Sequence, residues 1–207
     1  MENSGFNLVY SQGVIDFVSV ANEYCSFLEQ GNLGDRKETV GKLQSLLPLL
    51  YLRGALLPDV ESMFEDVNEK FVTEEDWNRI NGILRSKLGE FDDFLEVFDP
   101  RMKESDLPVV CSISENLADI YQDIKNFLML YRVGTNEIMN DSIWECKNNF
   151  RDYWGQKAVN SLRAIHLLAC NDNLDEENDN GYQGDDFNLD TGSWIISQRQ
   201  KDFQDNE

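Results

Sequence analysis

The side chains that could carry chemistry are few in this sequence, and His166 is the only histidine among 207 residues. A serine or cysteine nucleophile that needs an imidazole base would have to use it. His166 lies within "RAIHLLAC", at the edge of an apolar helix face, where a lone histidine usually marks only the boundary of a core. The four cysteines show no CxxC pair and no regular spacing. They therefore predict reduced thiols in a cytosol and not a zinc site.

Three carboxylates, Glu115, Asp119 and Asp123, follow one another at four-residue steps. On a helix this spacing places them on one side, where they could contribute to a Mg²⁺ or Ca²⁺ site with oxygens from another helix. The competing interpretation is a solvated face of an acidic protein, because like charges at this spacing cost only about a few tenths of a kcal/mol. No cofactor is predicted.

Two arginines are candidates for binding a ligand anion. Arg53 projects from the apolar side of a predicted helix, so it needs either a structural carboxylate or carbonyl partner or a bound anion. Arg151 shares a stripe with Trp144 and Gly155 at i, i+7 and i+11, and it could stack on the indole or bind an anion. Aromatic and arginine side chains at a core boundary more often simply pack. The core face beside this stripe is predicted to hold Ile143, Cys146, Phe150, Tyr153 and Trp154.

Composition and the absence of motifs exclude several common functions. With 39 acidic and 18 basic residues the formal net charge is −21, which disfavours phosphate backbones and anionic lipid, so neither direct nucleic-acid nor membrane binding is predicted. The sequence has no phosphate-cradling glycine loop, no GxGxxG and no GxSxG. No catalytic residue is assigned, and the balance favours a protein that is not an enzyme. The absence of a signal or transit pattern predicts a cytoplasmic location.

Apolar periodicity predicts an all-α fold, an irregular antiparallel bundle of six to seven helices over residues 6–170. No stretch alternates well enough to predict a strand. The expected helices cover residues 11–30, 35–57, 73–88, 91–98, 112–132 and 135–170, the last with a break or bend at Gly155.

The segment 35–57 carries leucines on two sides of the expected helix, with Leu49, Leu52 and Leu56 opposite the main apolar face. A helix that is apolar on both sides is usually buried. This segment is therefore predicted to be the central helix of the bundle, and Pro48 is predicted to kink it or divide it in two.

Residues 171–207 hold 11 acidic and two basic side chains and cannot build a core, which predicts an acidic, disordered tail. An apolar island within it, with Phe187, Trp194 and Ile195, could dock on a partner or back onto the helical domain. Met129 and Leu130 on the otherwise polar side of their helix form a second candidate docking patch.

Two segments, "VIDFVSVANEYCSFLE" (14–29) and "ENLADIYQDIKNFLMLYRVGTNEIMNDSIWECKNNFRDYWGQKAVNSLRAIH" (115–166), resemble an uncharacterised family of helical proteins from Bacteroides and relatives, domain of unknown function 5063. The resemblance covers most of residues 6–170. It implies an all-α bacterial cytoplasmic protein and supplies no activity or site residues.

Three functional hypotheses stay open on the sequence alone. The first is a non-enzymatic adaptor that binds another protein. The second is a binder of a small anionic ligand or divalent metal, which could be an enzyme, through Arg53, the Trp144 and Arg151 stripe, His166 or the three carboxylates. The third is a nucleic-acid mimic, since an acidic helical protein can occupy a basic groove.

Overall fold

The computed structural model describes residues 8–64, 68–96, 109–171 and 174. All of them belong to the first of two compact units, Met1–Asp175, whereas the second unit, Glu176–Glu207, lies outside the described residues. The predicted acidic tail therefore stays a prediction, and so does the docking role of Phe187, Trp194 and Ile195, which fall within it.

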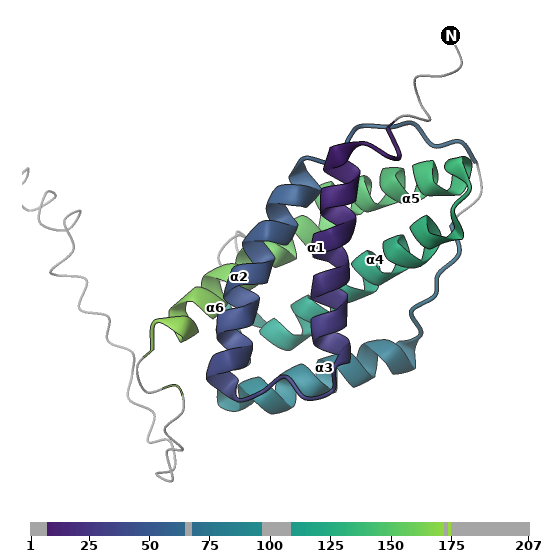
Figure 1. Ribbon diagram of the computed structural model, residues 1–207. Helices are drawn as coiled ribbons and strands as arrows, with labels where there is room; N and C mark the ends of the chain where they lie inside the picture. The colour runs from purple at the N-terminus through teal and green to yellow at the C-terminus, as the bar shows by residue number, and fades with distance from the viewer. Residues whose placement is uncertain (1–7, 65–67, 97–108, 172–173, 175–207) are drawn as a thin grey trace, which may run out of the picture. The chain divides into compact units, whose positions relative to one another are not determined.

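The described chain is mostly helical, as the periodicity predicts (Figure 1). In Figure 1, α1 and α2 lie side by side in front of α4, α5 and α6. A π-helical turn, Phe150–Trp154, connects α5 directly to α6. The helices are α1 (Gln12–Glu29), α2 (Arg36–Ala55), α3 (Glu74–Leu88), α4 (Ile113–Val133), α5 (Asn136–Asn149) and α6 (Gly155–Ala169).

Local sequence signals explain where several helices begin and end. Asp35 and Glu38 form a capping box at the start of α2, in which each side chain accepts from the other's backbone N–H. Thr73 and Asp76 do the same at the start of α3. Gly134, with φ of 84°, ends α4 in the left-handed conformation that glycine adopts without strain.

The segment after α3 departs from the prediction. A 3₁₀ turn, Gly89–Phe91, leads into β1 (Asp93–Leu95), which pairs antiparallel with β2 (Val110–Ser112). The predicted helix over 91–98 is therefore wrong, as is the expectation that the chain holds no strand. Buried Asp92 secures this corner, because its carboxylate accepts from the Ser112 hydroxyl at 2.8 Å and from the Ser114 N–H at 2.7 Å.

The core is formed where α1 and α2 pack on α4 and α6. Phe17 of α1 contacts the rings of Phe127 and Trp154, which come from α4 and the π-helical turn. The fully buried Tyr24 donates its hydroxyl to the Leu117 carbonyl at 2.9 Å, so α1 is fastened to α4 by a satisfied polar contact.

Helix α2 is not the central helix of the bundle. Leu43, Leu47 and Leu50 are buried, but the opposite side faces solvent, where Leu49, Leu52 and Leu56 are 47%, 51% and 57% exposed. The helix also runs through Pro48 without a break, so of the two predicted effects of this proline a division of the helix is wrong, and a kink stays a prediction.

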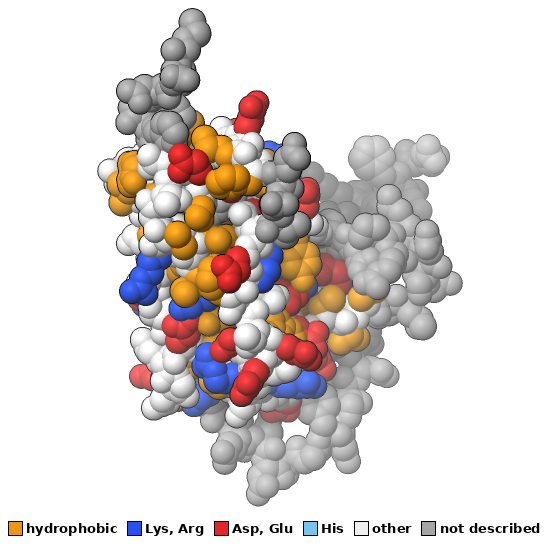
Figure 2. Space-filling model, turned by 90° about the vertical axis from the view of Figure 1, so that its right-hand side faces the viewer, with side chains coloured by type: hydrophobic (Ala, Val, Ile, Leu, Met, Phe, Trp, Pro, Cys, Tyr) orange, Lys and Arg blue, Asp and Glu red, His pale blue; other side chains and the backbone are white. Residues whose placement is uncertain are grey.

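A second group of exposed apolar side chains lies at the end of the bundle where α1 begins and α4 ends. Figure 2 shows hydrophobic side chains gathered toward the upper part of one face, among mixed acidic and basic ones. The loop after α2 is fixed there by Asp141, whose carboxylate accepts from the Met63 and Phe64 N–H groups at 2.7 and 2.9 Å. The exposed apolar residues of these loops and helix ends are Leu8, Tyr10, Met63, Phe64 and Val133.

Candidate functional site

The π-helical turn between α5 and α6 shapes the surface beside α2. Such turns are rare and often occur at functional sites. Two glycines make room for this turn: a Cβ on Gly155 would overlap the Phe150 carbonyl, and a Cβ on Gly54 would overlap the ring of Trp154. Trp154 itself is fully buried and donates its Nε1–H to the Cys146 carbonyl at 3.2 Å. The absence of side chains at Gly54 and Gly155 therefore allows α2 and the π-helical turn to pack closely.

A surface hollow of about 410 Å³ opens at this junction. Its aromatic wall is made by Tyr51 of α2 and Phe150, whose ring centroids are 5.1 Å apart. Its volume falls in the range of small-ligand pockets, about 300–1,000 Å³. The residues that line it are Tyr51, Phe150, Arg151, Gly155, Gln156, Val159 and Asn160.

An apolar surface continues from the hollow across the outer side of α2. At 100° per residue, Tyr51 and the exposed leucines fall within one arc of about 160°. We call this surface the α2 strip. Its members, all exposed, are Pro48, Leu49, Tyr51, Leu52, Ala55 and Leu56. Three half-exposed leucines on one helix face form the kind of apolar patch that marks an interaction site.

Helix α6 extends the same surface on the other side of the hollow. Gln44 bonds His166 at 3.2 Å and Tyr51 shares the hollow with Val159, so α2 and α6 run antiparallel and in register. Val159, Arg163 and Leu167, at four-residue steps, are all exposed; we call them the α6 row. The α2 strip, the hollow and the α6 row together are the α2–α6 face.

Two cations stand beside the hollow. Lys147 donates to the Ala55 carbonyl at 2.7 Å and lies 5.9 Å from the centre of the Phe150 ring. The Arg151 side chain is 63% exposed, and its only ion pair among described residues is with the exposed Asp59 at 3.6 Å. A surface pair at this distance contributes little, so Arg151 is available to an incoming carboxylate.

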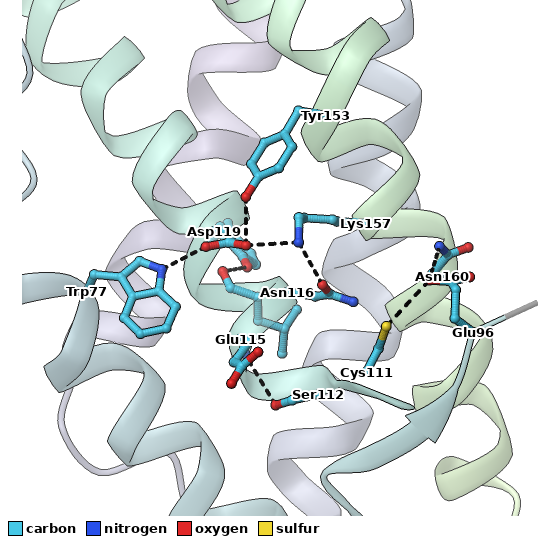
Figure 3. A network of polar contacts seen from close by, with 12 residues as sticks. Trp77, Glu96, Cys111, Ser112, Glu115, Asn116, Asp119, Tyr153, Lys157 and Asn160 are labelled. Atoms are coloured by element: carbon cyan, nitrogen blue, oxygen red, sulfur yellow. Dashed lines mark hydrogen bonds and ion pairs between the residues drawn. The ribbon is translucent and has the colours of Figure 1, made fainter. Parts of the chain in front are cut away.

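A polar network on the opposite side of the π-helical turn centres on Asp119 (Figure 3). This carboxylate accepts from Trp77 Nε1 and from the Tyr153 hydroxyl, both at 2.8 Å, and pairs with Lys157 at 2.9 Å. Lys157 also donates to Asn116 Oδ1 at 3.0 Å. Burial, followed by the hydrogen bond to Asp119, raises the pKa of Tyr153. The network ties α3, α4 and α6 together, and its groups are occupied with one another.

The three carboxylates predicted as metal ligands have different surroundings in the structure. Asp119 is already neutralised by Lys157, Asp123 accepts from Asn149 at 3.0 Å, and Glu115 lies at the exposed start of α4. Within the described ranges, no three acidic, cysteine or histidine side chains converge as metal ligands. The four-residue spacing does place the carboxylates along α4. The oxygens of Asp119 and Asp123, however, already accept hydrogen bonds from tryptophan, tyrosine, lysine and asparagine side chains of neighbouring elements.

Asp123 is the most unusual of the three. Its Oδ2 is buried and has no hydrogen-bond partner in the described part of the chain. Burial raises its pKa to about 6, and Glu145 and Asp119 act in the same direction, whereas the Asn149 hydrogen bond and Lys70 oppose the shift. The ionised form of the Asp123 carboxylate therefore destabilises the folded protein.

The other predicted site residues lie apart from one another. Arg53 is paired with Asp16 of α1 at 2.9 Å, which is the structural contact that its position required. His166 bonds Gln44 and lies 3.9 Å from the sulfur of Cys170 at the exposed end of α6. Trp144 is exposed and does not line the hollow, although Arg151 and Gly155 of the same predicted stripe do.

The predicted docking patch on α4 is not an open surface. Leu130 is only 5% exposed and Met129 is half-buried, so the chain's own helices cover most of the pair. One group of apolar residues that do face solvent lies on the outer side of α2, which the sequence pattern assigns to the core. The sequence did contain a signal for this exposed surface. The leucines on the other side of α2 are sufficient to form its buried face, so the additional leucines on the outer side are not needed for the core.

The fold defined by these elements is a mostly helical domain with a small antiparallel ribbon, in which the described residues form no helix long and apolar enough to cross a membrane. The chain belongs to the family described as domain of unknown function (DUF5063), whose model matches residues 9–171.

One solved structure is similar over most of the chain. It is the crystal structure of protein BF1032 from Bacteroides fragilis, a structural genomics target. The two sequences are 42% identical, the match covers 78% of this chain and 94% of that one, and the TM-score is 0.70. A search of curated proteins finds no match.

Proposed function

We propose that this protein is a non-enzymatic interaction module that binds a helix of another protein on the α2–α6 face. The single observation that carries the proposal is the solvent-facing row of Leu49, Leu52 and Leu56, each about half exposed, beside an aromatic-walled hollow. Burying such side chains would contribute roughly 25 cal/mol per Å² of apolar surface. The described part of the chain leaves these side chains half exposed, which supports a partner that covers them.

A helix is the partner element that the dimensions favour. From Pro48 to Leu56 the strip is about 12 Å long, two turns of helix, and it is flanked by the parallel row on α6. A partner helix packs at about 8–10 Å from its neighbours and inserts side chains at i, i+3, i+4 and i+7 between them. We assign the module to residues 6–170 of a cytoplasmic protein and residues 171–207 to its acidic tail, on composition alone.

The test compares two exposed pairs of substitutions. Leu52→Ser with Leu56→Ser removes apolar surface from the α2 strip, and Leu95→Ser with Val110→Ser does the same on the exposed β1–β2 ribbon. A partner identified with the wild-type protein should bind the strip variant at least about tenfold more weakly, measured by calorimetry, and the ribbon variant unchanged. Equal binding by both variants would refute the proposal.

Self-association is the alternative outcome of the same experiment. If sedimentation shows a wild-type dimer that the strip variant lacks, the face is occupied by a second copy, and the proposed partner helix is wrong. A monomer at the same concentration supports the proposal, since the face is then uncovered in the free protein.

A small anionic ligand in the hollow is a second candidate function. Arg151 at the rim of a 410 Å³ hollow supports it. It leaves the α2 strip without an explanation, so we rank it second. Thermal-shift measurements with aryl carboxylates, on wild type and Arg151→Gln, test it directly: stabilisation that the variant loses would favour a small ligand.

A further inference from the structure

Charge is distributed unevenly between the helices of this acidic protein. The chain carries 39 acidic residues, yet none lies between Thr39 and Ala55 of α2 or anywhere in α6. The same two segments contain four basic residues, Lys42, Arg53, Lys157 and Arg163. From Thr39 onward, α2 and α6 therefore contribute no carboxylate to the α2–α6 face.

The positions of these four basic residues decide which of them a partner on the α2–α6 face would contact. Lys42 and Arg53 pair with Glu23 and Asp16 of α1, at 2.7 and 2.9 Å, and Lys157 is taken by Asp119 on the other side of α6. Arg163 is exposed in the middle of the α6 row and has no ion pair among the described residues. Arg151 at the hollow is held only by a loose pair.

The acidic residues elsewhere in the domain have little effect on a ligand bound here. Exposed charges are screened over about 8 Å at physiological ionic strength, and packed helices are spaced by about 8–10 Å. A helix lying on α2 and α6 therefore responds mainly to the charges at its own edge. Among the described residues, those are Arg151, Arg163 and Lys147, against the carboxylates of Asp59, Asp152 and Glu96, the last of which accepts from Asn160 at the hollow at 2.9 Å.

We propose that the partner of the α2–α6 face is an acidic amphipathic helix. Its apolar stripe covers the α2 strip, one apolar side chain enters the hollow between Tyr51 and Phe150, and carboxylates beside the stripe pair with Arg151 and Arg163. This inference rests on the proposed function, because it specifies the chemistry of the helix that the face binds. It runs against the net charge of −21, which by itself would select a basic partner.

The test uses two synthetic helical peptides with the same leucines at i, i+3, i+4 and i+7. The positions beside the stripe are Glu in one peptide and Lys in the other, and the remaining positions are Ala and Gln. Anisotropy titration of the full-length protein at low and high salt gives the affinity of each. We expect the Glu peptide to bind about tenfold more tightly at low salt, with the preference reduced at high salt.

Variants separate the inference from the function on which it rests. The double variant Arg151→Gln, Arg163→Gln should bind the Glu peptide about three- to tenfold more weakly than the wild-type protein does. Its affinity for the Lys peptide should not fall. Both arginines are exposed, so the fold should tolerate the change. Arg79→Gln with Arg85→Gln, exposed on α3, is the matched control and should change neither affinity.

The outcomes can be told apart. If the Lys peptide binds as tightly as the Glu peptide, or more tightly, and both lose affinity to the Leu52→Ser, Leu56→Ser variant, the charge inference is wrong and the interaction face stands. If neither peptide binds the wild-type protein, or the strip variant binds them equally well, the proposed function fails and the inference fails with it.

Discussion

Asp123→Asn should stabilise this protein at neutral pH, although the substituted carboxylate accepts a hydrogen bond. The folded state raises the pKa of Asp123 from 3.8 to about 6, mainly by burial. The folded protein therefore binds this proton more tightly than the unfolded chain does. The contribution of Asp123 to stability is present below pH 3.8 and is lost as the pH rises through about 6. Above that pH the ionised carboxylate is a net cost.

The size of this cost follows from the shift. About two pKa units at 1.36 kcal/mol per unit give about 3 kcal/mol at pH 7.5, an upper limit because the group keeps some access to solvent. At pH 5.0, where the folded-state carboxyl is mostly protonated, the same linkage leaves about 1.6 kcal/mol. The amide keeps an oxygen for Asn149, and its NH₂ replaces the Oδ2 that already lacks a partner.

Urea unfolding followed by tryptophan fluorescence measures the difference between variant and wild type at the two pH values. Both lie above the pI of about 4.2, where solubility falls. We expect Asp123→Asn to raise the free energy of unfolding by up to about 3 kcal/mol at pH 7.5. At pH 5.0 the increase should be smaller by about 1.4 kcal/mol. Asp152→Asn, on the exposed side of the π-helical turn, is the control and should stay within about 0.5 kcal/mol at both. An Asp123 variant that is less stable than wild type at pH 7.5, or equally stabilised at both pH values, would contradict the reasoning.

Three further predictions test the fold by the same urea assay. Gly155→Ala should lower the free energy of unfolding by about 1–3 kcal/mol, because its Cβ would overlap a carbonyl of the π-helical turn. Gly41→Ala, with open space around it, should raise the free energy of unfolding by about 0.5–1 kcal/mol. Equal effects of the two substitutions would contradict this reasoning. Asp119→Asn should cost about 1–3 kcal/mol by leaving its three donors with a weaker acceptor. Arg53→Gln should cost less than about 1 kcal/mol, and a double-mutant cycle with Asp16→Asn gives the pair's own contribution.

The sequence predicts the helices well where their signals are local. The capping boxes at Asp35 and Thr73 and the glycine at 134 mark helix ends through contacts within a few residues. The strand β1 is missed for the opposite reason. Phe91 and Phe94 fit a helical spacing, and only pairing with β2, from a distant part of the sequence, makes the segment extended.

The candidate site is predicted only in part because it depends on a change of helical pitch. In a regular α-helix Tyr153 would share the buried face of Cys146 and Phe150. The wider π-helical turn keeps Phe150 against Trp154, with ring centroids 4.7 Å apart, and sends Tyr153 outward to Asp119. The same turn sets Arg151 and Gly155 beside Tyr51 of α2. Periodicity with a fixed step of 100° cannot anticipate this rotation.

The packing of α2 against α6 also sets the order in which the chain can fold during synthesis. The buried leucines of α2, including Leu43, Leu47 and Leu50, lie beside a helix that begins about 100 residues later. Arg36 at the start of α2 bonds the carbonyl of Leu174 at 2.9 Å. The side of α2 that packs on α6 thus stays uncovered, like its exposed side, until the ribosome has released α6, and at about 5–20 residues per second this lasts for roughly 5–20 s. Nascent α2 is consequently the segment of this domain where chaperone binding should concentrate.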